Sequence, residues 1–210
     1  MILAVAPSRL NGPAFLRGKR FTDNQPILMK APIFALFGFC LLVFGSTHSA
    51  AVAGGKDKRI TVKSTAFAPG GTIPARYTCS GKNVSPALQW DQIPSGTRSI
   101  CLICDDPDAP AGTWVHWVMF DIPDSAKGLP EGVPQSEGTA AGARQGKNDF
   151  GNLGYGGPCP PSGRAHRYFF RLYALDRLIG RNPGISRADL DEAMKGHILA
   201  WGELMGTFQR

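Results

Sequence analysis

The stretch Trp114-Val-His-Trp-Val-Met-Phe-Asp-Ile122 decides the fold class of this chain of 210 residues. Apolar residues stand at both odd and even positions, so both faces of an extended strand would be buried. Strict alternation assigns Trp114, His116, Val118, Phe120 and Ile122 to one face and Val115, Trp117 and Met119 to the other. We predict a central strand of a β-sheet.

A second stretch, His166-Arg-Tyr-Phe-Phe-Arg-Leu-Tyr-Ala-Leu175, follows the same period. One predicted face carries His166, Tyr168, Phe170 and Leu172, and the opposite face carries Arg167, Phe169, Arg171 and Tyr173. Shorter strands are predicted from Arg59 to Phe67 and over 99–104, each followed by a turn rich in proline. The pattern is therefore mainly β.

Two other segments complete the expected architecture. Ser186 can cap a helix, and the spacing of Leu190, Met194, His197 and Trp201 predicts that the helix is amphipathic and packs on the sheet. Residues 124–165 contain ten Gly and five Pro with little apolar periodicity. Irregular segments of that length are often functional.

The first 53 residues are predicted to be a signal peptide region rather than part of the fold. Residues 33–44 form an uncharged apolar run, which is too short for an ordinary membrane span and has the length of a signal-peptide core. We therefore expect a periplasmic or secreted protein. The alternative is an N-terminal membrane anchor that is not cleaved.

Cleavage is expected after the small residues Ala51-Val-Ala53, and cleavage after Ala50 is the close alternative. The mature domain would then cover residues 54–210. Met29-Lys30 stands where such a signal peptide would begin, so residues 1–28 are interpreted as an over-extended start.

The net charge of +7 would ordinarily suggest nucleic acid or acidic membranes as partners. Removal of residues 1–53 takes away five basic residues and one acidic residue, which leaves a net charge of +3 on the mature domain. The longest charged run there is Lys56-Asp-Lys-Arg59. We expect no nucleic-acid partner and at most a peripheral contact with membranes.

Each of the two strong strands carries one histidine on a mostly apolar face, and Asp106 lies in the turn before the first strand. If the strands are neighbours, His116, His166, Tyr168 and Asp106 converge at one end of the sheet. A single buried histidine is more often an ordinary core residue, and aspartate before proline is common in turns. The residue pattern alone leaves both interpretations open.

The adjoining Gly- and Pro-rich segments favour an anion site, because they supply backbone N–H groups that can surround an anion. A protonated histidine and the Tyr168 hydroxyl would add further donors. A carboxylate beside a bound anion is unexpected, because like charges repel each other. Asp106 can keep a neighbouring histidine protonated, or it can bind the ammonium group of a zwitterionic ligand.

Several motifs, in order along the chain, carry a family resemblance. They are Tyr77-Thr-Cys-Ser-Gly-Lys-Asn-Val-Ser-Pro-Ala-Leu-Gln-Trp90, Asp106-Pro-Asp-Ala-Pro110, Trp114-Val-His-Trp-Val118, Asn148-Asp-Phe-Gly151, Gly154-Tyr-Gly-Gly-Pro-Cys-Pro-Pro161 and Gly163-Arg-Ala-His-Arg-Tyr168. The chain resembles the phosphatidylethanolamine-binding protein (PEBP) family, in particular the bacterial branch called Raf kinase inhibitor-like proteins. The resemblance runs from about residue 59 to the C-terminus.

The resemblance implies a large antiparallel sheet packed with a smaller one, and few peripheral helices, including one near the C-terminus. It assigns a small anion cavity to Asp106, His116, Pro158, His166 and Tyr168. The implied ligands are phosphate-like anions or phosphoethanolamine head groups, without a metal or another cofactor. For some members it also implies a protein partner, a kinase or a protease that is inhibited.

Two cysteines stand in the family segments: Cys159 in the cavity segment and Cys79 in the Tyr77 motif. We expect them to form a disulfide in the exported protein, with two independent buried thiols as the alternative. Such a bond would close a loop of about eighty residues and stabilise the fold by roughly 4 kcal/mol in the chain-entropy model. Cys101 and Cys104 are expected to be packed apolar residues.

Two other function classes are alternatives for this sequence. A hydrolase dependent on a metal or a histidine could use the same Asp/His cluster, but the chain contains no G-x-S-x-G or H-E-x-x-H motif. We therefore expect a binding protein rather than an enzyme. A protein-interaction module would use exposed loops, and residues 124–147 are the candidate segment.

Overall fold

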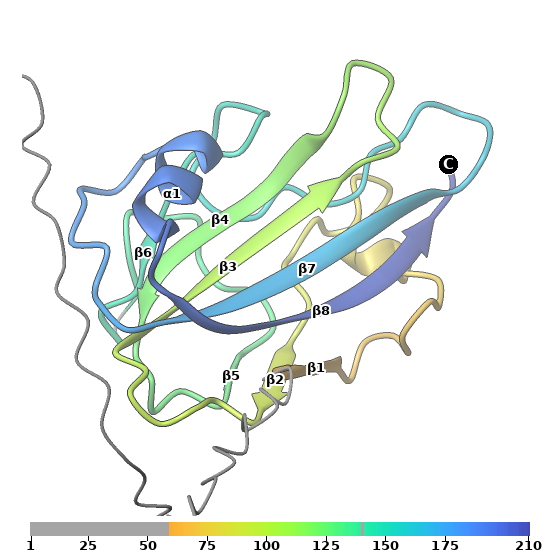
Figure 1. Ribbon diagram of the computed structural model, residues 1–210. Coiled ribbons are helices and arrows are strands. Elements are labelled where there is room, and N and C mark those ends of the chain that lie inside the picture. The colour runs from red at the N-terminus through yellow and green to blue at the C-terminus, as the bar shows by residue number, and fades with distance from the viewer. Residues whose placement is uncertain (1–58, 140) are drawn as a thin grey trace, which may run out of the picture. The chain divides into compact units, whose positions relative to one another are not determined.

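The computed structural model describes residues 59–139 and 141–210, and the predicted signal peptide region 1–53 lies outside them. The described chain folds into two antiparallel sheets with one α-helix, as Figure 1 shows. The predicted fold class, a large antiparallel sheet packed with a smaller one, is confirmed.

The large sheet has the strand order β6-β4-β3-β7-β8. Its strands are β3 (Ser99–Asp106), β4 (Trp114–Ile122), β6 (Arg144–Gln145), β7 (His166–Leu175) and β8 (Ile198–Phe208). The smaller sheet has the order β1-β2-β5, with β1 (Thr61–Ser64), β2 (Leu88–Asp91) and β5 (Gly128–Leu129). The first strand is thus shorter than the predicted Arg59 to Phe67. A 3-10 helix covers Ala75–Tyr77.

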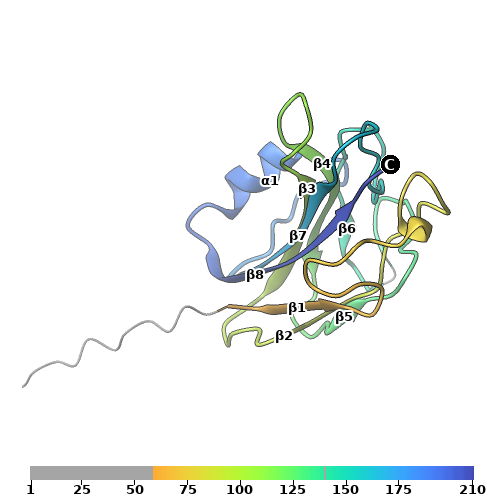
Figure 2. The ribbon, with the colours of Figure 1, turned by 90° about the vertical axis from the view of Figure 1, so that its right-hand side faces the viewer.

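The two faces of the large sheet are covered by different elements. The smaller sheet packs on one face and helix α1 (Arg187–Met194) on the other, as the view in Figure 2 shows. Tyr168 and Phe170 belong to the core between the sheets, whereas Leu190 and Met194 of α1 belong to the outer cluster. The predicted faces of β7 agree with this division.

The predicted faces of β4 are wrong in part, because two bulges interrupt its pairing with β3. Cys104 pairs with Trp117, but the next residue, Asp105, pairs with Val115, so His116 is an extra residue on β4. Strict alternation therefore fails at this point. Val115 was predicted to share a face with Trp117 but belongs with Val118 to the cluster under α1. Ile122 was predicted to share a face with Val118 but belongs with Trp117 to the core between the sheets.

The predicted helix near the C-terminus forms with its cap but ends early. Ser186 accepts a hydrogen bond from the N–H of Asp189, and the Asp189 carboxylate accepts one from the N–H of Ser186, which completes a capping box. Gly196 has a φ of +75°, a left-handed conformation, and β8 follows it. Trp201 consequently lies on a strand opposite Tyr173, not on the helix.

Strand β8 contains glycines where the smaller layer approaches it closely. A Cβ atom at Gly202 would lie 1.9 Å from the carbonyl oxygen of Ile60. The N–H of Ile60 donates to the carbonyl of Trp201 at 2.9 Å. Only glycine allows this contact, so a residue type that normally weakens a strand is required here.

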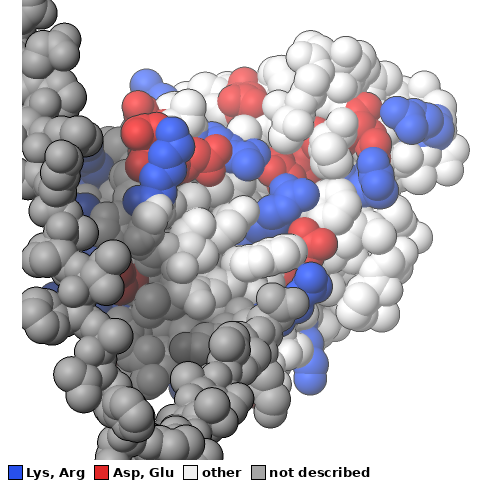
Figure 3. All heavy atoms as spheres, in the orientation of Figure 1, with Lys and Arg blue, Asp and Glu red and all other residues white. Residues whose placement is uncertain are grey.

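Acidic and basic side chains alternate on the face that carries α1, β7 and β8 (Figure 3). Arg171 pairs with Glu203, and Arg187 pairs with Asp191. This face therefore carries no field of a single sign. Within residues 59–139 and 141–210, no helix is long and apolar enough to cross a membrane.

Candidate functional site

A cavity of about 190 Å³ opens at the end of the large sheet where β3 ends and β4 and β7 begin. Three of the predicted site residues line it: Asp106, His116 and His166. Cys159 lines it as well, and the remaining lining residues are largely apolar: Ala109, Pro110, Trp114, Phe150, Pro160 and Pro161. The structure thus brings both histidines and the aspartate together, but on three strands: β3, which ends at Asp106, lies between β4 and β7.

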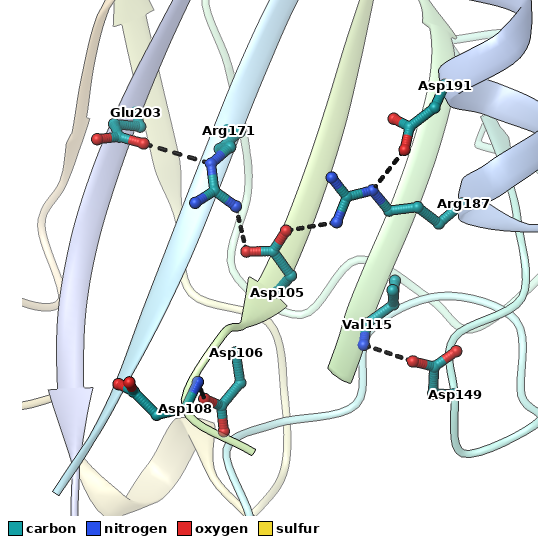
Figure 4. Close-up of polar contacts among 9 residues, drawn as sticks. All are labelled: Asp105, Asp106, Asp108, Val115, Asp149, Arg171, Arg187, Asp191 and Glu203. Atoms are coloured by element: carbon teal, nitrogen blue, oxygen red, sulfur yellow. Dashed lines mark hydrogen bonds and ion pairs between the residues drawn. The ribbon is translucent and has the colours of Figure 1, made fainter. Parts of the chain in front are cut away.

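Asp106 and His166 form a buried pair at the base of this cavity. The Oδ2 atom of Asp106 lies 2.8 Å from Nδ1 of His166, and the two residues are 3% and 5% exposed. The other carboxylate oxygen of Asp106 accepts the backbone N–H of Asp108 at 2.8 Å (Figure 4). An ionised carboxylate only accepts hydrogen bonds, so Nδ1 of His166 carries the proton and Nε2 remains for a ligand.

His116 is presented by the bulge in β4. Its carbonyl accepts the N–H of Gly156 at 2.8 Å, and its Nδ1 donates to the carbonyl of Gly156 at 2.6 Å. These two bonds fix the ring and place the proton on Nδ1. Burial lowers the pKa of His116 below its ordinary value of 6.5, so the ring is neutral at pH 7.

Hydrogen bonds hold the loop of residues 148–156 to the start of β4. The carboxylate of Asp149 accepts the N–H of Val115 at 2.7 Å, as Figure 4 shows, and the N–H of Asp149 donates to the carbonyl of Val115. The side chain of Asn148 donates to the carbonyl of Gly154 and accepts the N–H of Phe150. These bonds hold Phe150 over the cavity.

The opposite wall is held by contacts with the segment around Tyr77. The Tyr155 hydroxyl donates to the carbonyl of Tyr77 at 2.8 Å, and the N–H of Gly157 donates to the side chain of Asn83 at 2.7 Å. A Cβ atom at Gly157 would lie 2.3 Å from the Tyr77 carbonyl oxygen, so this approach requires glycine. Pro158 is buried, and its carbonyl accepts the N–H of Cys79. The structure places Pro158 behind the lining.

Cys79 and Cys159 meet at this wall. Their Cα atoms are 5.4 Å apart, a spacing typical of disulfides. Cys101 and Cys104 are buried elsewhere in the sheet, where burial raises the pKa of both thiols. Neither of these two lines the cavity.

Tyr168 also lies behind the lining, packed edge-to-face on His116 with ring centroids 5.2 Å apart. Burial, together with the nearby charge of Asp106, raises the pKa of Tyr168, so its hydroxyl keeps its proton. Among the described residues, two buried side-chain atoms have no hydrogen-bond partner within the protein: the Tyr168 hydroxyl and Nε1 of Trp114. Buried polar atoms without a partner are rare and call for an explanation.

Trp114 and Phe150 were not predicted as site residues. Their rings pack edge-to-face at 5.5 Å, and Phe150 packs on His116 at 5.4 Å. The motif Asn148-Asp-Phe-Gly151 pointed to this segment, but its pattern could not show that Phe150 lies over the cavity. Trp114 looked like an ordinary residue of an apolar strand.

The sheet carries a different arrangement directly behind the cavity. Asp105, 1% exposed, pairs with Arg171 of β7 and, at 2.6 Å, with Arg187 of α1. These arginines in turn pair with Glu203 and Asp191, as drawn in Figure 4. The network ties four elements, β3, β7, β8 and α1, together on the outer face.

Residues 59–139 and 141–210 contain no group of three or more His, Cys, Asp and Glu side chains placed to hold a metal ion. The polar groups of the residues that line the cavity include one carboxylate, two imidazoles and the indole N–H of Trp114, and the Tyr168 hydroxyl lies behind the lining. Such a set can bind a small charged group by hydrogen bonds.

Related sequences place this fold in a known family. The family model described as phosphatidylethanolamine-binding protein matches residues 63–209. A protein named UPF0098 from Methanothermobacter thermautotrophicus is 53% identical over 151 residues, which cover 72% of this chain and 99% of that protein. A UPF0098 protein from Aquifex aeolicus is 48% identical, over 71% of this chain and 88% of that protein.

Solved structures of similar proteins belong to the same family. The crystal structure of CT736 from Chlamydia trachomatis, described as a PEBP homolog, matches with a TM-score of 0.67 and 38% identity, over 73% of this chain and 99% of that one. The structure of E. coli YbcL, described as a new member of the mammalian PEBP family, matches with a TM-score of 0.68 and 33% identity, over 72% and 99%. The chain belongs to the phosphatidylethanolamine-binding protein family.

Proposed function

We propose that the cavity binds a small anion of the phosphate type, either free or as part of a phosphoethanolamine head group. The observation that carries the proposal is the pair of buried donors without a partner, Nε1 of Trp114 and the Tyr168 hydroxyl. An indole N–H can only donate, so a ligand that satisfies it must supply an acceptor. Trp114 lines the cavity together with Asp106 and His166, and Tyr168 packs on His116 behind the lining.

The two histidines would respond to an anion through Nε2. In each ring Nδ1 is occupied, by Gly156 in His116 and by Asp106 in His166. A proton on Nε2 turns that atom from an acceptor into a charged donor. Anion affinity should therefore weaken as the pH rises through the pKa of His116, which burial lowers below 6.5. Sulfate is the suitable probe because its own charge is constant, and an unchanged affinity between about pH 5 and pH 8 would contradict this role.

Asp106 favours a zwitterionic ligand over a plain anion. Its carboxylate is buried, and among the described residues its only side-chain hydrogen-bond partner is His166, so a cation can approach the same group. An ethanolamine ammonium group would supply that cation while the phosphate binds the donors. We expect phosphoethanolamine to bind more tightly than inorganic phosphate.

We propose binding rather than catalysis. A hydrolase that forms a covalent intermediate on a hydroxyl or an amine would need a serine, threonine or lysine in the cavity, and none is among the lining residues in the described part of the chain. The sulfur of Cys159 lies within bonding distance of the Cys79 sulfur. A hydrolase would still turn over a phosphate ester in the binding assay below, which distinguishes the two functions.

We further propose that the protein is exported and that Cys79 and Cys159 are bonded in its mature form. The described domain begins at Arg59, so the expected cleavage before Gly54 would leave the fold intact. Mass measurement of the mature protein tests both points: the expected mass starts at Gly54 and lacks two hydrogens. A mass that includes residues 1–53 would favour the membrane anchor.

Protein partners, a kinase or a protease, would meet the exposed part of residues 124–147, in which 134–138 are exposed. This contact would be separate from the cavity. Substitution of His166 should therefore leave inhibition of such a partner intact while it removes anion binding.

Calorimetric titration with inorganic phosphate and with phosphoethanolamine tests the proposed function. His116→Ala and His166→Ala should each abolish measurable binding. His197→Ala is the matched control, because His197 is paired with Asp176 outside the cavity. Unchanged affinity in both cavity variants, or loss of binding in the His197 variant, would contradict the site.

A further inference from the structure

The Cys79–Cys159 pair connects the cavity to the segment that supports its wall. Cys159 lines the cavity, whereas Cys79 is exposed and is not one of the lining residues. The two residues are 80 positions apart in the sequence. The pair is therefore a long-range tether that ends at the ligand site.

The hydrogen bonds that tie this wall to the segment around Tyr77 stop before Cys159. The Gly157 N–H bonds to Asn83, and the Pro158 carbonyl accepts the N–H of Cys79. The next lining residues, Pro160 and Pro161, have no N–H with which to bond. The disulfide is thus the tether closest to the lining on this side, and its loss would leave the two prolines less well positioned.

Cys159 also changes its chemistry when the bond opens. Nη1 of Arg210 lies 3.6 Å from its sulfur. A neighbouring guanidinium favours the thiolate form of a cysteine. Reduction would therefore place a negative charge in the wall of a cavity that binds anions, in addition to releasing the wall.

We infer that Cys79 is a positioning residue of the cavity, acting through Cys159, and that reduction of this pair lowers the affinity for anions. The inference rests on the proposed function. The reductant is a dithiol. One of its thiolates attacks the exposed sulfur of Cys79, the S–S bond breaks, and Cys159 leaves as a thiolate beside Arg210.

The second thiol of the reductant completes the exchange. Its thiolate attacks the reductant's own sulfur in the mixed disulfide, and Cys79 leaves and takes up a proton. In the overall reaction the dithiol loses two electrons and two protons and becomes a cyclic disulfide. The two cysteines gain the two electrons. One proton goes to Cys79, and the other goes to water while Cys159 remains a thiolate or to Cys159 when it is protonated.

The test is phosphate titration of the purified protein before and after treatment with a dithiol, with alkylation and mass mapping to verify the state of Cys79 and Cys159. Affinity should fall roughly three- to tenfold on reduction. Cys79→Ser and Cys159→Ser should both bind as weakly as the reduced protein and should not respond to the dithiol.

The two serine variants also separate positioning from charge. Cys79→Ser keeps a thiol in the cavity wall, and Cys159→Ser keeps a neutral hydroxyl. Between about pH 6 and pH 9, the phosphate affinity of Cys79→Ser should fall further relative to that of the oxidised protein. The affinity of Cys159→Ser should show no such additional fall. Val62→Ala, in the core and not among the lining residues of the cavity, is the control for a general loss of stability and should keep full affinity.

The outcomes are distinguishable. If the oxidised protein binds neither phosphate nor phosphoethanolamine, the proposed function fails. If the oxidised protein binds and reduction changes nothing, or if Val62→Ala weakens binding as much as reduction does, the inference fails and the proposed function stands. Equal pH profiles in the two serine variants would overturn the role of the Cys159 charge.

Discussion

Asp105 and Asp106 are adjacent in β3, yet their environments differ. Asp105 points to the outer face, where two arginines bind both of its oxygens. Asp106 points to the cavity, where His166 is its only side-chain hydrogen-bond partner among the described residues. Arginines bind both oxygens of the outer carboxylate, whereas the inner carboxylate belongs to a site with two buried donors, Nε1 of Trp114 and the Tyr168 hydroxyl, that have no partner within the described residues. Of the two carboxylates, Asp105 contributes to stability, and we propose that Asp106 contributes to ligand binding.

Replacement of Asp105 by Asn should give the largest loss of stability. It removes the charge that binds Arg171 and Arg187, and breaking a buried pair on one side costs about 3 kcal/mol of unfolding free energy. Chemical denaturation measures the loss. Glu203→Gln is the control: Glu203 is partly exposed and binds the same Arg171, so its loss should stay below about 1 kcal/mol. Equal losses would remove the distinction between the two faces.

Asp106→Asn should act on binding more than on stability. Without the carboxylate, phosphoethanolamine should bind about tenfold more weakly, equivalent to 1.4 kcal/mol, and lose its advantage over inorganic phosphate. Competitive titration with the two ligands measures the ratio. If the preference for phosphoethanolamine survives, Asp106 does not bind its ammonium group.

Ser186→Ala tests whether α1 contributes to stability without affecting ligand binding in the cavity. Loss of the capping hydroxyl should lower the free energy of unfolding by about 1 kcal/mol. Phosphate affinity should be unchanged, because α1 lies across the sheet from the cavity. An affinity change as large as that of Asp106→Asn would show that the two faces are coupled.

His116 should make a smaller, pH-dependent contribution to stability. Its pKa in the folded state lies below the ordinary 6.5 because of burial, so the unfolded chain binds more protons as the pH falls. Stability should therefore decrease on acidification through about pH 6.5, and less so in His116→Gln. Thermal melts of both proteins across this range check the sign. Parallel curves would mean that His116 titrates normally.

The sequence allowed some parts of this structure to be predicted and not others. The faces of β7 were correct because its period is uninterrupted. The faces of β4 failed at His116, since a bulge depends on the partner strand and leaves no sign in a single sequence. Strand β8 was missed because Gly202 breaks its pattern, and that glycine is required by a contact with Ile60.

The candidate site shows the same division. Asp106, His116 and His166 could be predicted from their strands and from the family motifs, and the structure brings them together. Two lining residues were not predicted: Trp114, which carries one of the unpartnered donors, and Phe150. Their roles follow from tertiary contacts between a loop and β4.

The central claim is that an anion binds between the two cavity histidines. Nitrogen NMR of the histidine rings during titration with inorganic phosphate tests it most directly. We predict that Nε2 of His116 and Nε2 of His166 shift together and saturate with one binding constant, while the ring of His197 does not move. Equal small shifts at all three rings, or no shift at His116 and His166, would contradict the claim.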